Sequence, residues 1–209
     1  MSGIDTILAQ FVEYEIRKNL GPTAIQKIEK RLFEKYGVSL TESMNQFEKF
    51  DDVLQEFFGQ GAKGLEQKAF KKLLVIGESE KVKNHVQIII KNPYLANQIM
   101  AIIADKEKFG ILACVFDQSK ISSEIIRECH LAQTSGYRKI KELFRAGFLI
   151  EDGHIMTSDG KKAYKFKSFF GPTKIDIHKD KISVKTHILK QHAKTSNLLQ
   201  VFEAPLAVS

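Results

Sequence analysis

Two groups of basic residues in the C-terminal half of the chain have side chains suited to binding a polyanion. The first lies in the sequence QTSGYRKIKELFRAG, where Arg138, Lys139 and Lys141 alternate with apolar residues. The second is the pair Lys161 and Lys162, directly after an Asp-Gly dipeptide. Lysine binds phosphate as a point charge, and arginine donates two hydrogen bonds to a guanine base. The two groups predict contact with nucleic acid, and a solvated surface is the alternative explanation of the same charges.

The first group belongs to a predicted helix that spans residues 134–146, begins at Thr134 or Gln133 and ends at Gly147. Residues at helical spacing give it a predicted buried face: Tyr137, Ile140, Leu143 and Phe144. Projected at about 100° per residue, a polar set falls on the opposite side, with Lys139 and Lys141 on its flanks: Ser135, Arg138, Glu142 and Arg145. The exposed face is therefore expected to be basic and rich in hydrogen-bonding groups.

The second group belongs to a predicted hairpin. After Gly147 the apolar period becomes strand-like, and Asp159-Gly160 favours a tight turn because both residues tolerate positive φ. In KKAYKFKSFF, Tyr164 and Phe166 alternate with Lys165 and Lys167. The pattern predicts a basic β-wing beside the helix, so that the helix enters a major groove while Lys161 and Lys162 reach the phosphate backbone.

Two shorter helices are expected before the basic helix, one capped by Asp105 and one capped by Ser122 or Ser123. The region from about Ile102 to His187 resembles archaeal winged helix-turn-helix regulators of the ArsR-like type. The resemblance rests on IIADKEKFGIL, SSEIIRECHLAQTSGYRKIKELFRAGFLI, DGKKAYKFKSFF and KIDIHKDKISVK. It implies that Lys161 and Lys162 lie on the wing and that the start of the recognition helix holds six residues: Gln133, Thr134, Ser135, Tyr137, Arg138 and Lys139.

No metal or cofactor is expected. Metal-sensing members of the broader family use paired Cys or Cys/His ligands, whereas this chain has only Cys114 in the corresponding helix. Adjacent helical positions such as Cys129 and His130 point about 100° apart, so burial of Cys129 as a free thiol is the favoured interpretation. The chain also lacks the phosphate-loop, serine-elbow and H-E-x-x-H motifs. We therefore expect no enzymatic activity.

The first 76 residues are predicted to form an all-helical module. Gly21-Pro22 and Gly37 end helices, and Ser39 and Glu42 have the spacing of a capping box. The sequence EKYGVSLTESMNQFEKFDDVLQEFFGQGAKGLE resembles the fifth Nitrosopumilus output domain family. That resemblance implies an accessory role beside signalling or DNA-binding domains, and we expect dimerisation or signal reception.

Residues 77–96 are the predicted boundary. The run around Val86–Ile90 suits a strand or a helix, and a connecting linker helix is favoured. TKIDIH and KISVKTHI are predicted to form an extra hairpin that extends the wing sheet. The expected fold is mainly α with a small β part: a helical bundle at 1–76, a winged helix-turn-helix at 97–188 with its extra β-hairpin, and a mobile tail at 189–209.

Charge agrees with this division. Residues 1–100 have a net charge of +1 and residues 101–209 a net charge of +6. No apolar run is long enough to span a membrane, and a cytoplasmic location without membrane contact is expected. The predicted function is transcriptional regulation by a homodimer that binds double-stranded DNA, with a possible signalling or transcription partner on the N-terminal module. The alternative is a protein-interaction adaptor that uses a winged-helix scaffold.

Overall fold

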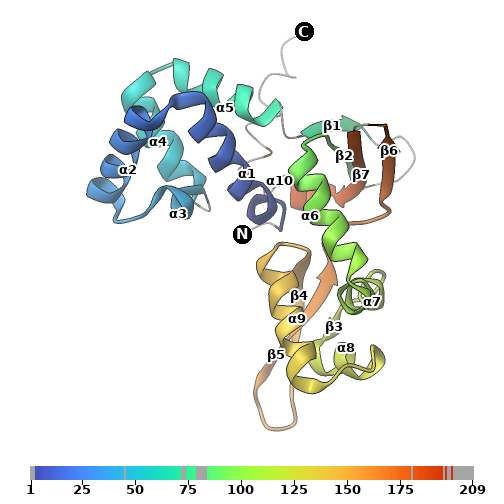
Figure 1. Ribbon diagram of the computed structural model, residues 1–209. Coiled ribbons are helices and arrows are strands. Elements are labelled where there is room, and N and C mark those ends of the chain that lie inside the picture. The colour runs from blue at the N-terminus through green and yellow to red at the C-terminus, as the bar shows by residue number, and fades with distance from the viewer. Residues whose placement is uncertain are drawn as a thin grey trace.

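A computed structural model describes residues 3–44, 46–71, 74–78, 84–179, 181–194, 196 and 199. Within these ranges the protein is mainly α-helical with a smaller β part, as the sequence predicts (Figure 1). The N-terminal helices are α1 (Gly3–Leu20), α2 (Pro22–Tyr36), α3 (Leu40–Met44), α4 (Phe47–Phe58) and α5 (Gly61–Lys71). None of the helices in these ranges has the length and apolar character needed to cross a membrane.

Local signals account for the boundaries of the N-terminal helices. α2 ends where Gly37 adopts a left-handed φ of 65° and its amide donates to the carbonyl of Phe33 at 2.9 Å. Ser39 and Glu42 form the predicted capping box. The Glu42 amide donates to Ser39 Oγ at 3.2 Å, and the Ser39 amide donates to the Glu42 carboxylate at 2.8 Å. Because these signals are local, they could be read from the sequence.

The N-terminal helices pack around a continuous apolar core. Its largest fully buried side chains come from α1 to α4: Leu8, Ile28, Leu32, Leu40, Met44, Phe50 and Leu54. Of the phenylalanines on α4, Phe47 and Phe50 are buried and Phe57 is exposed. The prediction that the first 76 residues are all helical is wrong for residues 74–76, which belong to a strand (Leu74–Glu78).

A four-stranded antiparallel sheet follows, in the order β1-β2-β7-β6. Its strands are β1 (Leu74–Glu78), β2 (His85–Ile90), β6 (Lys174–His178) and β7 (Lys181–Leu189). The predicted linker helix is therefore wrong: residues 85–90 form a strand, and helix α6 (Pro93–Ala104) begins only after Asn92. β2 pairs with β7, with Ile88 opposite Thr186, and this distant partner completes its backbone hydrogen bonds.

The hairpin predicted near the C-terminus is confirmed as β6–β7, with Ile175 opposite Val184. The expectation that it extends the wing sheet is wrong, because β7 pairs with β2 instead. The four-stranded sheet thus contains strands from both sides of the predicted boundary at residues 77–96. We call it the composite sheet.

The remaining elements form a second unit: α7 (Lys106–Cys114), β3 (Lys120–Ile121), α8 (Ser122–Glu128), α9 (Gln133–Arg145), β4 (Leu149–Met156) and β5 (Lys162–Ser168). Its strands make a three-stranded sheet in the order β3-β5-β4. α6 packs against both β7 and α7, and so joins this unit to the composite sheet. In Figure 1 the tip of the β4–β5 hairpin points away from the N-terminal helices.

The predicted mobile tail is partly helical. Residues 190–194 form helix α10 (Lys190–Lys194), which packs against β7, β2 and α1. Beyond it, Ser196 donates a buried hydrogen bond from Oγ to the Asp5 carboxylate at the other end of the chain. The expectation of a mobile tail otherwise falls on residues 195, 197–198 and 200–209, which lie outside the described residues.

Candidate nucleic-acid interface

The position of α9 is set by its close packing against α8. Gly136 is buried, and a Cβ atom at this position would lie 2.6 Å from Ile126 Cγ1, closer than van der Waals contact allows. The turn between the helices passes through His130, which has a positive φ of 52°. Only glycine at position 136 lets the helices approach this closely. This residue was not among those predicted for the site, although a glycine one turn into an amphipathic helix can indicate close packing.

The buried face of α9 is narrower than predicted. Ile140 and Leu143 are buried as expected, but Tyr137 is 45% exposed and Phe144 is also exposed, so the prediction is wrong for these two aromatic residues. Phe144 nevertheless makes an edge-to-face contact with Phe166 of β5, with ring centroids 5.6 Å apart. This contact fixes the helix against the hairpin.

The exposed side of α9 carries most of the residues predicted to contact DNA. Gln133, Thr134 and Lys141 are exposed, and Ser135 is half-buried. The side chain of Arg138 is 63% exposed, and its Nη1 lies 2.8 Å from Glu142 Oε1, one helical turn away. Exposed pairs of this kind are weak, at roughly 0.3–0.5 kcal/mol, so the guanidinium can exchange Glu142 for another acceptor.

Lys139 differs from its neighbours because its ammonium group is already occupied. Its side chain is only 13% exposed, and Nζ lies 2.9 Å from the carboxylate of Asp105 and 3.3 Å from that of Glu107. The hydrogen bond to Asp105 raises the pKa of Lys139, and the same bond lowers the pKa of Asp105. Lys139 was predicted to contact DNA, but here it ties α9 to the start of α7.

Asp105 is the predicted cap of α7, and its carboxylate accepts from the amides of Glu107 and Lys108 at 3.0 and 3.1 Å. The predicted serine caps of α8 are wrong. The residue before α8 is Ile121, whose amide donates to the carboxylate of Glu124 at 3.0 Å. The short strand β3 places Ile121 at the helix start, and β3 was not predicted.

The predicted Asp-Gly turn joins β4 to β5. The Thr157 amide donates to the Lys161 carbonyl at 2.9 Å, and Gly160 adopts a positive φ of 75°. Lys161 is 82% exposed and pairs with Asp159 at 3.0 Å, while Lys162 is exposed on the adjoining strand. Both lysines therefore project at the tip of the hairpin.

Some cations near this face have no carboxylate partner within the described ranges: Lys141, Arg145 and Lys162. The carboxylates Glu142 and Asp159 are each paired with a basic side chain of the same unit. A phosphate that approaches α9 or the hairpin tip therefore meets some cations without a carboxylate partner. It also meets Arg138 and Lys161, whose exposed ion pairs are weak.

Cys114 and Cys129 are free thiols and half-buried. Burial raises the pKa of Cys129 to about 11, with a smaller contribution from the neighbouring Cys114. Burial likewise raises the pKa of Cys114. Both thiols are therefore protonated at neutral pH. In the described part of the chain, no group of three or more His, Cys, Asp or Glu side chains is arranged to hold a metal ion.

Comparison of the chain with protein-family models, curated proteins and solved structures gave no match.

Proposed function

We propose that the protein is a transcriptional regulator that binds double-stranded DNA through a winged helix-turn-helix formed by α7, β3, α8, α9, β4 and β5. The helix–strand–helix–helix–strand–strand order, with β3 paired to β5, is typical of a winged helix. It agrees with the resemblance to ArsR-like regulators. α9 has 13 residues, so it is roughly 20 Å long. A helix with its side chains is about 10–12 Å across, which fits a major groove about 12 Å wide.

One observation carries the proposal most directly. The exposed basic side of α9 and the lysine-bearing tip of the hairpin belong to one packed unit, joined by the contact between Phe144 and Phe166. A helix that reads bases and a wing that holds phosphates must keep a fixed spacing, because the groove and the backbone do. In this assignment Arg138 reads a base, while Lys141, Lys161 and Lys162 bind phosphates.

We further propose that the regulator acts as a homodimer, since two half-sites multiply the specificity of one small module. The N-terminal helices are the proposed site of dimerisation or signal reception. Phe33 on α2 and Tyr14 on α1 are exposed aromatic side chains in this region, and such side chains are enriched in protein interfaces. The proposed location is the cytoplasm.

A protein-interaction adaptor is the second candidate, and the exposure of Tyr137 favours it. A tyrosine that is 45% exposed in the middle of α9 would serve as an anchor in a protein interface. The charges around it favour DNA. Tyr137 is flanked by Arg138 and lies on the helix that also carries Lys141 and Arg145.

The test compares two pairs of exposed lysines on two hairpins. Lys161 and Lys162 lie at the β4–β5 tip, whereas Lys179 and Lys181 lie at the β6–β7 tip in the composite sheet. Replacing either pair with alanine removes the same charge. We expect the Lys161→Ala/Lys162→Ala variant to bind mixed-sequence duplex less tightly, with a slope of log affinity against log salt shallower by about one to two units.

The measurement is fluorescence anisotropy of a labelled duplex at several salt concentrations. The Lys179→Ala/Lys181→Ala variant should keep the wild-type slope, because its hairpin belongs to the other sheet. Equal slopes for both variants and the wild type would remove the wing from the DNA interface. No binding of duplex by the wild type at low salt would favour the adaptor.

A further inference from the structure

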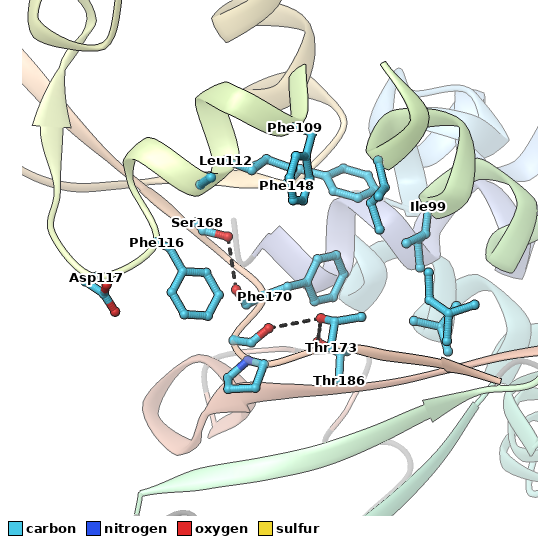
Figure 2. A pocket seen from close by; sticks show the side chains of 16 residues that line it. Ile99, Phe109, Leu112, Phe116, Asp117, Phe148, Ser168, Phe170, Thr173 and Thr186 are labelled. Atoms are coloured by element: carbon cyan, nitrogen blue, oxygen red, sulfur yellow. Dashed lines mark hydrogen bonds between the residues drawn. The ribbon is translucent and has the colours of Figure 1, made fainter. Parts of the chain in front are cut away.

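A large apolar cavity lies where the winged-helix unit meets the composite sheet. Its volume is about 520 Å³. One wall is formed by α6 and by the α7 region that ends at Phe116, and the opposite wall is formed by β6 and β7 (Figure 2). Cavities of 300–1,000 Å³ are typical of sites for small ligands.

The walls are built mainly from apolar and aromatic side chains of both units. They include Ile99, Phe109, Phe148, Phe170 and Val184. Phe109 is 51% exposed although it lies inside this hollow. Aromatic side chains that line a cavity and stay half-exposed lose apolar contacts, and an apolar ligand would restore them.

One apolar face of α7 and of the turn after it points into this cavity. It is made by Phe109, Leu112, Ala113 and Phe116, which all line the cavity. Phe109 and Phe116 are exposed on this face, so they are accessible to a ligand.

A small number of polar groups converge at one side of the cavity. Thr173 Oγ1 donates to the Gly171 carbonyl at 2.9 Å and lies 2.7 Å from the hydroxyl of the buried Thr186. Ser168 Oγ donates to the Phe170 carbonyl at 3.0 Å, which leaves its lone pairs open to a donor. The exposed Asp117 also lines the cavity, but Figure 2 shows it at the margin, apart from these hydroxyl groups. These oxygens favour a ligand that donates hydrogen bonds and disfavour an anionic one.

The size of the cavity favours a small molecule over a protein partner as its ligand. Stable protein interfaces bury about 800 Å² on each partner. A helix with its side chains is about 10–12 Å across. A hollow of about 520 Å³, walled on opposite sides by α7 and by the composite sheet, is too small for such an element.

We propose that this cavity binds a neutral or cationic, largely apolar small molecule with a hydrogen-bond donor directed at the hydroxyl groups of Ser168 and Thr173. Binding at this site does not depend on the proposed DNA contact. A regulatory effect on DNA does rest on the proposed function: Phe109 and Phe148 belong to the winged-helix unit, while Val184 belongs to the composite sheet, so a ligand contacts both sides.

The test is a fluorescence titration of the full chain with N-phenyl-1-naphthylamine, a neutral apolar probe that carries one N–H donor. We expect saturable binding with one probe per chain. Ala113→Trp places a large side chain in the cavity and should weaken binding at least tenfold. Ala101→Trp is the matched control, because Ala101 is an exposed alanine of α6 outside the cavity lining. It should bind the probe as the wild type does.

The melting temperature of each variant and the dependence of probe binding on protein concentration are measured as well. If Ala113→Trp lowers the thermal melting temperature, Phe116→Ala replaces it. Its control is Phe57→Ala, at an exposed phenylalanine of α4 outside the cavity lining, and only Phe116→Ala should weaken binding. Non-saturable binding, or equal affinities for a variant and its control, would overturn the proposal. Probe binding that appears only as a dimer dissociates on dilution would also overturn it, because a second copy would then cover the cavity.

DNA affinity measured with and without saturating probe separates this proposal from the proposed function. A changed affinity would support regulation through the cavity. Saturable probe binding by a chain that binds no duplex would support the ligand site and contradict the proposed function.

Discussion

The two C-terminal hairpins are alike in sequence but are held in different ways. Both β4–β5 and β6–β7 alternate apolar residues with lysine, and both carry exposed lysines near the turn. Within the described part of the chain, the β4–β5 hairpin pairs with no strand besides the short β3, and its tip points away from the N-terminal helices. In the other hairpin, β7 also pairs with β2 over six positions, from His85–Leu189 to Ile90–Val184.

The two hairpins therefore differ in how much of the fold holds them in place. The β6–β7 hairpin is anchored to the N-terminal half of the chain through β2, and α5 packs against β1 at the far side of the same sheet. The base of the β4–β5 hairpin packs against α7, α8, α9 and β3, with Leu149 and Ile150 buried, whereas its tip is exposed. Substitutions at the tip should therefore affect folding little.

The largest expected effect on the free energy of unfolding comes from the strand β2, which pairs with β7 of the β6–β7 hairpin. Ile88 of β2 is fully buried opposite Thr186 of β7, and Ile155 of β4 is only half-buried opposite Ala163. Ile88→Ala should lower the free energy of unfolding by about 2–5 kcal/mol, because it leaves a cavity in the composite sheet. Ile155→Ala is the matched control and should cost less than about 1 kcal/mol. Urea denaturation followed by circular dichroism measures both.

Comparable losses in these two variants would show that the β4–β5 hairpin is held as firmly as the β6–β7 hairpin.

A smaller effect on the free energy of unfolding is expected from Glu66 of α5, the helix that packs against β1 of the composite sheet. Burial, with a smaller contribution from the nearby Asp51 carboxylate, raises the pKa of Glu66 to about 8. A carboxyl whose pKa is raised on folding stabilises the folded state at low pH, and this contribution is lost as pH rises through about 8. The free energy of unfolding should therefore fall between pH 5 and pH 8.5.

Glu66→Gln removes this dependence and should stabilise the chain at pH 8.5 by on the order of 1–3 kcal/mol, with little effect at pH 5. Glu34→Gln changes the same charge at an exposed position and is the control. Thermal melting across this pH range measures the effect. An equally steep pH dependence in Glu66→Gln and the wild type would exclude Glu66 as its source.

The smallest effect on stability is expected at Arg138 of α9, where a substitution should change DNA affinity instead. Arg138→Ala should cost about 1–3 kcal/mol of binding free energy on a duplex selected by the wild type, and far less on random duplex, because a bidentate contact to guanine is lost. The melting temperature should stay nearly unchanged, since Arg138 is exposed and packs in no core. Binding titrations at one salt concentration measure both duplexes.

Arg31→Ala, which removes an exposed arginine of α2, is the control and should bind both duplexes as the wild type does. Equal and small losses for Arg138→Ala on the two duplexes would leave this residue as a solvated surface charge.

Several helix boundaries and one turn could be predicted from the sequence. The cap of α7 at Asp105, the capping box of Ser39 and Glu42, the left-handed Gly37 and the Asp159-Gly160 turn were all predicted and are confirmed. Each depends on residues a few positions apart, so the physics that decides it is contained in a short stretch of chain. The same holds for the exposure of Arg138 and Lys161.

The sheet that each strand joins, and the partner of a surface residue such as Lys139, could not be predicted from the sequence because they depend on distant segments of the chain. Residues 85–90 were predicted as helix and form a strand because β7, far along the chain, supplies their hydrogen bonds. Lys139 lies on the flank of the basic face, yet Asp105 of another helix occupies its ammonium group. The cavity arises in the same way, since its walls come from α6, α7 and the composite sheet. Such pairings depend on which distant segments meet, and no local pattern of residues encodes that choice.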